Sequence, residues 1–125
     1  MTPSPTILLV DDYADALEVW ELYLRSSGFT VATATNGRDA LAYIAATPPD
    51  LAVLDLQLDR MSGCDIARAL RADQVTRTLP LIAATGHSHS DMIEEATTAG
   101  FDVVLVKPCD PDRLVDEIRR LLASR

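Results

Sequence analysis

The amino-acid sequence predicts an α/β fold in which a parallel five-stranded sheet is covered by helices on both faces. Five short apolar runs of strand length alternate along the chain with five segments of helical spacing. Hydrophobic residues make up 48% of the chain but aromatic residues only 5%, so the core consists of the aliphatic side chains that fill buried parallel strands. The length, 125 residues, suits one domain. Right-handed crossovers place the helices on both faces, which gives a doubly wound (βα)5 sandwich.

Each predicted strand is bounded by turn-forming or charged residues. The short Pro-rich segment 1–6 is predicted to be a flexible N-terminal lead, and residues 7–125 are predicted to form the domain. The predicted strands are Ile7–Val10, Thr30–Ala34, Leu51–Leu54, Leu81–Ala84 and Val103–Val106.

The first predicted helix carries one apolar face and ends at Gly28, because glycine commonly follows a helix C-terminus. The residues of that face are Tyr13, Leu17, Trp20 and Leu24. Sequence signals also mark the other four helices. The second helix follows Asn36-Gly37, and the third begins at a capping box of Ser62 and Asp65. The fourth helix starts at Ser90 and stops at Gly100, and its face carries Ile93, Ala96 and Thr97. The fifth helix has the strongest signal, with Asp110 as its N-cap and Pro111 in its first turn.

The charge and the cysteine content exclude several classes of protein. A net charge of −8 argues against a nucleic-acid or anionic-membrane surface, because both require clustered Lys and Arg. No apolar run reaches the roughly 20 residues of a membrane span. Cys64 and Cys109 do not form a disulfide scaffold, and no secretory signal precedes them. We therefore expect two free thiols in a cytoplasmic protein.

Reactive side chains gather where the predicted strands end. Asp11 and Asp12 follow the first strand, Asp55 ends the third, Thr85 ends the fourth, and Lys107 follows the fifth, whereas nothing notable follows the second. In an open α/β sheet, ligands bind beyond the carboxyl ends of the strands. Each residue alone has an ordinary explanation as a helix cap or a turn, but an idle carboxylate after the buried run before Asp55 would be costly. The combination is more specific than its parts.

Three neighbouring carboxylates repel one another, and a bound Mg²⁺ resolves this conflict because it prefers oxygen ligands and is commonly held by carboxylates and phosphate. With the metal and Lys107 neutralising charge, a carboxylate oxygen of Asp55 can attack a phosphoryl donor and form an acyl phosphate. Thr85 can then donate a hydrogen bond to the phosphoryl oxygens. The pattern indicates a phospho-acceptor site.

With these residues the chain resembles the receiver domain of two-component response regulators, from about Ile7 to the last helix. The matching elements are Asp11-Asp12, Asp55, Gly63, Ala84-Thr85-Gly86 and Lys107-Pro108. The resemblance implies a flavodoxin-like sheet of strand order 2-1-3-4-5. The segment around Lys107 is similar to receivers attached to hybrid sensor kinases.

The resemblance also implies a mechanism. Asp55 would take a phosphoryl group from a phosphohistidine of a sensor histidine kinase or a histidine phosphotransfer protein. Mg²⁺ would be bound directly by Asp12, Asp55 and the backbone carbonyl of Gln57, and through water by Asp11. Lys107 would contact the phosphoryl group. Such a domain is a switch or relay that catalyses only its own phosphorylation and dephosphorylation, and it is expected to be a monomer or weak dimer.

Two residues depart from the pattern of receiver domains. Asp59 stands where a proline is usual, and Val104 stands where an aromatic residue usually pairs with the threonine to form the switch. The resemblance further implies a cis Lys107-Pro108 bond. Gln57 and His87 occupy the positions that influence the lifetime of the phosphoryl group in such domains, and we hypothesise that they tune its hydrolysis.

Other functions make expectations that the sequence does not meet. An aspartyl phosphatase resembling haloacid dehalogenases needs a second acid two residues after the nucleophile, where this chain has Gln57. A flavodoxin-like cofactor binder needs a Ser, Thr and Gly-rich loop where Asp11 and Asp12 stand. A pseudo-receiver used only for protein contacts stays open because of Val104, as does a phosphoryl sink. No helix-turn-helix segment follows the fifth helix, so we expect a stand-alone receiver or one excised from a larger protein.

Overall fold

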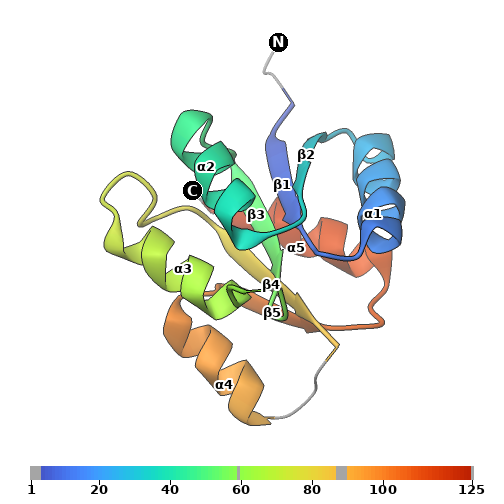
Figure 1. The fold of residues 1–125 in the computed structure, drawn as a ribbon. Coiled ribbons are helices and arrows are strands. Elements are labelled where there is room, and N and C mark those ends of the chain that lie inside the picture. The colour runs from blue at the N-terminus through green and yellow to red at the C-terminus, as the bar shows by residue number, and fades with distance from the viewer. Residues whose placement is uncertain (1–3, 59, 87–89, 125) are drawn as a thin grey trace.

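The structure is a computed structural model, and it describes residues 4–58, 60–86 and 90–124. Figure 1 shows a central sheet with helices on both of its faces. Ten elements alternate strictly between strand and helix along the described chain, as predicted.

The five strands form one sheet in the order β2-β1-β3-β4-β5, and every neighbouring pair is parallel. The strands are β1 (Thr6–Val10), β2 (Thr30–Ala34), β3 (Leu51–Asp55), β4 (Leu81–Thr85) and β5 (Val103–Val106). This confirms the predicted α/β fold and strand order. β1 begins at Thr6, one residue inside the predicted lead, and Asp55 and Thr85 belong to their strands as the last residues.

The four later helices begin where the sequence signals place them, and the first begins one residue after Tyr13. They are α1 (Ala14–Ser26), α2 (Gly37–Ala46), α3 (Gly63–Ala72), α4 (Ser90–Ala99) and α5 (Pro111–Ala123). The side chain of Asn36 accepts a hydrogen bond at the start of α2, and Asp110 does the same at the start of α5. Ser62 and Asp65 form both halves of a capping box on α3. These caps satisfy N–H groups that have no partner inside a helix.

Two residues do not lie on the apolar faces to which their spacing assigned them. Tyr13 is the N-cap of α1 and is 64% exposed. Because a cap residue does not have helical backbone angles, the 3.6-residue period does not govern its direction. Thr97 is exposed on α4, and its hydroxyl donates to the carbonyl of Ile93 one turn earlier.

The sheet divides the core into two apolar layers. α1 and α5 cover one face, where Leu17, Leu24 and Ile118 pack against β1, β3, β4 and β5, and half-buried Trp20 covers the edge of this layer. α2, α3 and α4 cover the other face, where Ile44 packs in the second layer. The central strands are therefore buried on both sides, which explains their continuous apolar sequences. This leaves the strand ends as the place for polar chemistry.

No helix within the described residues is long and apolar enough to cross a membrane. Cys64 and Cys109 are both free thiols, as expected.

Candidate functional site

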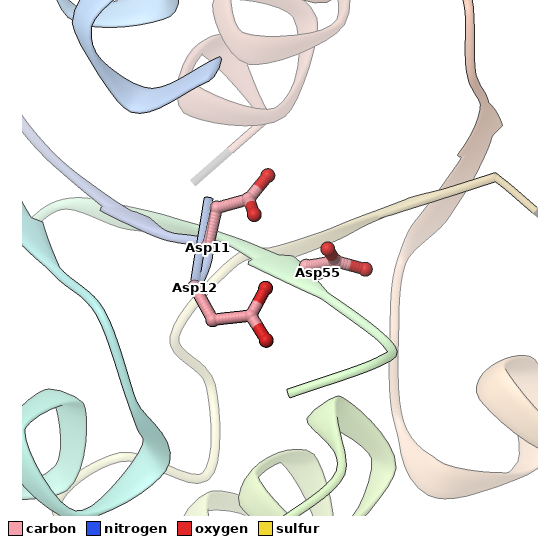
Figure 2. Close-up of side chains that lie close together, drawn as sticks. All are labelled: Asp11, Asp12 and Asp55. Atoms are coloured by element: carbon pink, nitrogen blue, oxygen red, sulfur yellow. The ribbon is translucent and has the colours of Figure 1, made fainter. Parts of the chain in front are cut away.

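Strand register brings three carboxylates together at one edge of the sheet. Val10 pairs with Leu54, so the residues that follow them, Asp11 and Asp55, lie side by side, and Asp12 comes next along the chain. One carboxylate oxygen from each aspartate lies within 4.8 Å of the others. Figure 2 shows the three side chains close together at the ends of β1 and β3. The structure thus assembles the predicted acidic cluster.

Asp11 is the most buried of the three, and both of its oxygens accept hydrogen bonds. Its Oδ1 accepts from the backbone N–H of Tyr13 at 3.0 Å, and its Oδ2 accepts from Lys107 Nζ at 2.8 Å. Asp12, by contrast, is exposed. The oxygens of Asp12 are therefore the more accessible ones for a direct metal ligand, whereas Asp11 already has partners for both.

The two oxygens of Asp55 have different neighbours. Oδ1 accepts from the backbone N–H of Gln57 at 3.0 Å, and Oδ2 lies 3.7 Å from Lys107 Nζ. Burial raises the pKa of the Asp55 carboxyl, and the hydrogen bond from Gln57 and the charge of Lys107 offset this only in part. The ionised form of a half-buried carboxylate beside two others is unfavourable, and a nearby cation would stabilise it.

Lys107 is the cation of the cluster among the described residues. Burial alone disfavours its ammonium form, but the hydrogen bond to Asp11 and the charge of Asp55 outweigh that effect and raise the pKa of Lys107. Its backbone N–H donates to the carbonyl of Thr85 at 2.6 Å, which ties the end of β5 to β4. The Lys107-Pro108 peptide bond is cis, as predicted. Lys107 is thus a charged donor held between two carboxylates.

The loop after Asp55 is closed tightly by Gly63. The N–H of Gly63 donates to the carbonyl of Leu56 at 3.0 Å. A Cβ on Gly63 would lie 2.4 Å from the carbonyl oxygen of Asp55 and 2.9 Å from the Cα of Leu56. Only glycine permits this approach of the start of α3 to the end of β3, and the approach fixes the backbone on which Asp55 and Gln57 stand.

Thr85 is brought to the same edge, but its side chain is completely buried. It is absent from the lining of the acidic cleft, where the next residue, Gly86, takes part. The predicted hydrogen bond from Thr85 to a phosphoryl oxygen therefore stays a prediction.

The acidic cluster lies in an open cleft of about 1050 Å³. Thr35 and Asn36 line this cleft, so the end of β2 does contribute to the site, contrary to the sequence prediction. The sequence prediction did not include Thr35 and Asn36 because neither residue is charged. The position of Asn36 directly after a parallel strand was the available signal, since all such ends meet at one edge. Exposed Tyr13 also lines the cleft, although the sequence assigned it to the core.

The donor set of this cleft fits a small divalent cation. Three carboxylates with a total charge of −3 lie near one ammonium group, that of Lys107. Carboxylate oxygens are the ligands that Mg²⁺ prefers. Gln57 is exposed and lines the same cleft. Val104 is half-buried and packs against the layer under α2, α3 and α4. Asp59 and His87 lie outside the described residues.

Comparison with known proteins gives one family. The sequence model of the response regulator receiver domain matches residues 7–119. The transcriptional regulatory protein PrrA of Mycobacterium leprae is 38% identical over 122 residues, which is 98% of this chain and 52% of that protein. The DNA-binding response regulator MtrA of Mycobacterium bovis is 35% identical over 121 residues, 97% of this chain and 52% of that protein. The chain thus spans about half the length of these curated relatives.

Solved structures agree in fold. A response regulator structure from Chloroflexus aurantiacus superposes with a TM-score of 0.92 at 32% identity, covering 96% of this chain and 98% of that one. The receiver domain of a sensor histidine kinase from Pseudomonas aeruginosa gives a TM-score of 0.89 at 28% identity, covering 96% and 98%. That structure has a magnesium ion coordinated in its active site cleft.

Proposed function

The chain belongs to the response regulator receiver domain family, and we propose that it acts as a phospho-acceptor in a two-component phosphorelay, with Asp55 as the residue phosphorylated. One observation carries the proposal: Asp55, with a pKa raised by burial, ends a central strand within reach of Lys107 and beside two further aspartates. Such an environment marks functional sites more often than structural ones.

The proposed reaction is transfer from a phosphohistidine of a sensor histidine kinase or histidine phosphotransfer protein. The Asp55 carboxylate attacks phosphorus, its O–P bond forms, and the N–P bond of the donor breaks. Oδ2 of Asp55 is the oxygen that faces Lys107 at 3.7 Å. As the phosphoryl group arrives, the Lys107 ammonium is placed to pair with its oxygens, and Asp11 holds that ammonium in position at 2.8 Å.

Mg²⁺ is the proposed cofactor, with Asp12, Asp55 and the backbone carbonyl of Gln57 as direct ligands and Asp11 as a ligand through water. When bound, it neutralises charge on the transferring phosphoryl oxygens. The role of Asp11 is supported by its two existing hydrogen bonds, which leave it less free than Asp12. We propose that the domain catalyses only its own phosphorylation and dephosphorylation. We also propose a cytoplasmic location, which the two free thiols support.

Val104, at the position that the switch aromatic usually occupies, favours a phosphoryl relay or sink over a threonine–aromatic switch. Val104 is a short β-branched side chain packed against the core, and it has no ring to rotate. We therefore propose that phosphorylation of Asp55 is passed on or hydrolysed, or that it is read through another route than a threonine–aromatic pair.

The test is direct phosphorylation. The protein is incubated with Mg²⁺ and acetyl phosphate, or with a phosphorylated kinase, and intact mass is measured. We expect one added phosphoryl group on the wild type and on Asp116→Asn, which removes an exposed acid from α5, and none on Asp55→Asn. Trp20, the single tryptophan, lines a small apolar cavity together with Asp55 and Lys107, so its fluorescence gives a separate readout of metal binding. A wild type that gains no mass from either donor refutes the proposal.

A further inference from the structure

Two arginines beside the acidic cleft face the same open hollow. Arg38, in the first turn of α2, and Arg60, in the β3–α3 loop, both line a hollow of about 630 Å³ together with Asn36, Asp39 and Met61. Both arginines are exposed. Among the described residues, neither side chain has a hydrogen bond or an ion pair. The hollow is therefore lined by two cationic side chains that have no acceptor within the described chain, and by one carboxylate, that of Asp39, which accepts from the Asn36 side chain at 3.0 Å.

Most other cations of the described chain are engaged, and this sets the pair apart. Side-chain hydrogen bonds, ion pairs or a ring contact occupy Arg25, Arg68, Arg71, Lys107, Arg119 and Arg120. Arg77, in the α3–β4 loop, and Arg113, in α5, are the remaining two, and they line no common hollow. In a chain of net charge −8, two arginines in one hollow with no partner among the described residues are a local exception.

The backbone that carries the two arginines is fixed by a close contact. A Cβ on Gly37 would lie 2.8 Å from Met61 Sδ and 3.1 Å from Ile66 Cδ1, so Met61 packs directly on the start of α2. This contact joins the residue before Arg38 to the residue after Arg60. Arg60 has a φ of 69°, a left-handed conformation that is uncommon for a residue with a side chain. An arginine kept in a conformation that suits glycine or asparagine better points to a use for its side chain.

The hollow adjoins the acidic cleft. Asn36 lines both the hollow and the cleft that contains Asp12 and Asp55, so the hollow lies next to the surface that a protein reaching Asp55 must contact. The cleft repels the acidic surface of an approaching partner protein, whereas the arginine pair attracts it. Charges at the rim of an interface act mainly on the rate of association and on its specificity.

We propose that Arg38 and Arg60 form a docking site for carboxylates on the partner protein that flank its phosphohistidine; this inference rests on the function proposed above. The geometry suggests which groups on the partner the arginines would bind. The phosphoryl group itself goes to Asp55 and Lys107, whereas the arginines, in the adjoining hollow, meet the partner surface around the donor histidine. The transfer is unchanged, since the N–P bond breaks, the bond to an Asp55 oxygen forms, and the histidine nitrogen takes up a proton. The arginines thus select which donor is used and how fast it binds.

The experiment compares two synthetic peptides, each with one phosphohistidine, flanked by four glutamates in one peptide and by four glutamines in the other. Initial rates of Asp55 phosphorylation are measured by intact mass at sub-saturating peptide, with Mg²⁺, at low and at high salt. We expect the wild type to accept from the glutamate peptide about threefold to tenfold faster at low salt, which is the range that two exposed charge pairs give. Because such charges are screened within about 10 Å at 0.1 M salt, the preference should shrink as salt rises.

Matched variants separate the arginine pair from net charge. Arg38→Gln/Arg60→Gln should lose the preference for the glutamate peptide. Arg77→Gln/Arg113→Gln removes the same charge from two other arginines that have no hydrogen bond or ion pair among the described residues, and it should keep the preference. Acetyl phosphate, which carries no flanking carboxylates, should phosphorylate all three proteins at similar rates and so shows that the acceptor site is intact.

The outcomes are distinct. A wild type that reacts with acetyl phosphate but shows no preference for the glutamate peptide overturns the docking site, and so does a preference that survives in Arg38→Gln/Arg60→Gln or disappears equally in Arg77→Gln/Arg113→Gln. A wild type that accepts no phosphoryl group from any of these donors overturns the proposed function itself, and the docking site with it.

Discussion

Replacing Gly63 with alanine should both destabilise the protein and slow its phosphorylation. The added Cβ would lie 2.4 Å from the carbonyl oxygen of Asp55, and real Cβ contacts are essentially never below 3.0 Å, so the gap must open by at least 0.6 Å. The contacted atoms belong to the backbone and cannot rotate away. We therefore assign about 3 kcal/mol to the clash and about 1 kcal/mol to the weakened hydrogen bond from Gly63 to Leu56. The higher helix propensity of alanine returns up to about 1 kcal/mol.

The net loss is about 3 kcal/mol in the free energy of unfolding. For a chain of 125 residues the entropy of unfolding is about 0.26 kcal/mol/K, so Tm should fall by about 11 °C. Because the clash displaces the backbone of Asp55 itself, the initial rate with acetyl phosphate should fall by up to about a hundredfold. Thermal unfolding by circular dichroism and phosphorylation by intact mass measure the two effects. Gly86→Ala is the stability control, since a Cβ there meets nothing within 4 Å. A Gly63→Ala protein with Tm within about 2 °C of wild type refutes the reasoning.

Three further predictions follow from contacts at the site and away from it. Lys107→Ala removes the donor to buried Asp11 and should cost about 1.5–3 kcal/mol in chelator; Mg²⁺ should then raise Tm more than it does in wild type, which thermal melts with and without the metal measure. Arg71→Lys keeps the charge but loses the fork that donates to four carbonyls and to Asp102, so unfolding in urea should show a loss of about 2–3 kcal/mol. Burial raises the pKa of both the Cys64 and the Cys109 thiols, so alkylation at pH 7 should be slower than for a free thiol and should accelerate as the pH rises. Half-buried Cys109 should react before Cys64, as mass spectrometry of digests can show.

Elements defined by local signals were predictable from the sequence. The N-caps Asn36 and Asp110 and the Ser62–Asp65 box act within one turn of their own helix, so a short window of sequence contains the whole cause. The apolar runs likewise reveal buried strands, because a strand covered on both faces needs apolar residues at every position. Residues that end such runs then meet at one edge, which is how Asp11, Asp12, Asp55 and Lys107 could be grouped.

What escaped prediction depends on contacts between segments or on the exact edge of an element. Tyr13 had the spacing of an apolar helix face, but the helix begins one residue later, so its ring lies at the rim of the cleft. Thr85 was correctly placed at a strand end, yet side chains alternate between faces along a strand, and that alternation leaves Thr85 buried and outside the lining of the cleft. The packing of Met61 on Gly37 joins the β3–α3 loop to the start of α2, and no pattern within either segment encodes it.

Three carboxylates gathered at the edge of an apolar sheet, one of them buried and one half-buried, are a costly arrangement for a part of the protein without a function. Asp11 is 7% exposed and Asp55 sits in a site where burial raises its pKa, while Asp12 adds a third negative charge within 4.8 Å. In the described part of the chain one ammonium, that of Lys107, pairs with two of the three, Asp11 and Asp55. Amide residues at these positions would remove the repulsion and could still accept the backbone hydrogen bonds, while the two aliphatic layers would continue to hold the strands. A sequence that follows local folding rules throughout its core and gathers three carboxylates at one strand edge calls for a positive counter-charge there. Under the function proposed above, that charge is Mg²⁺, and Lys107 lies within reach of Asp55 to meet the incoming phosphoryl group.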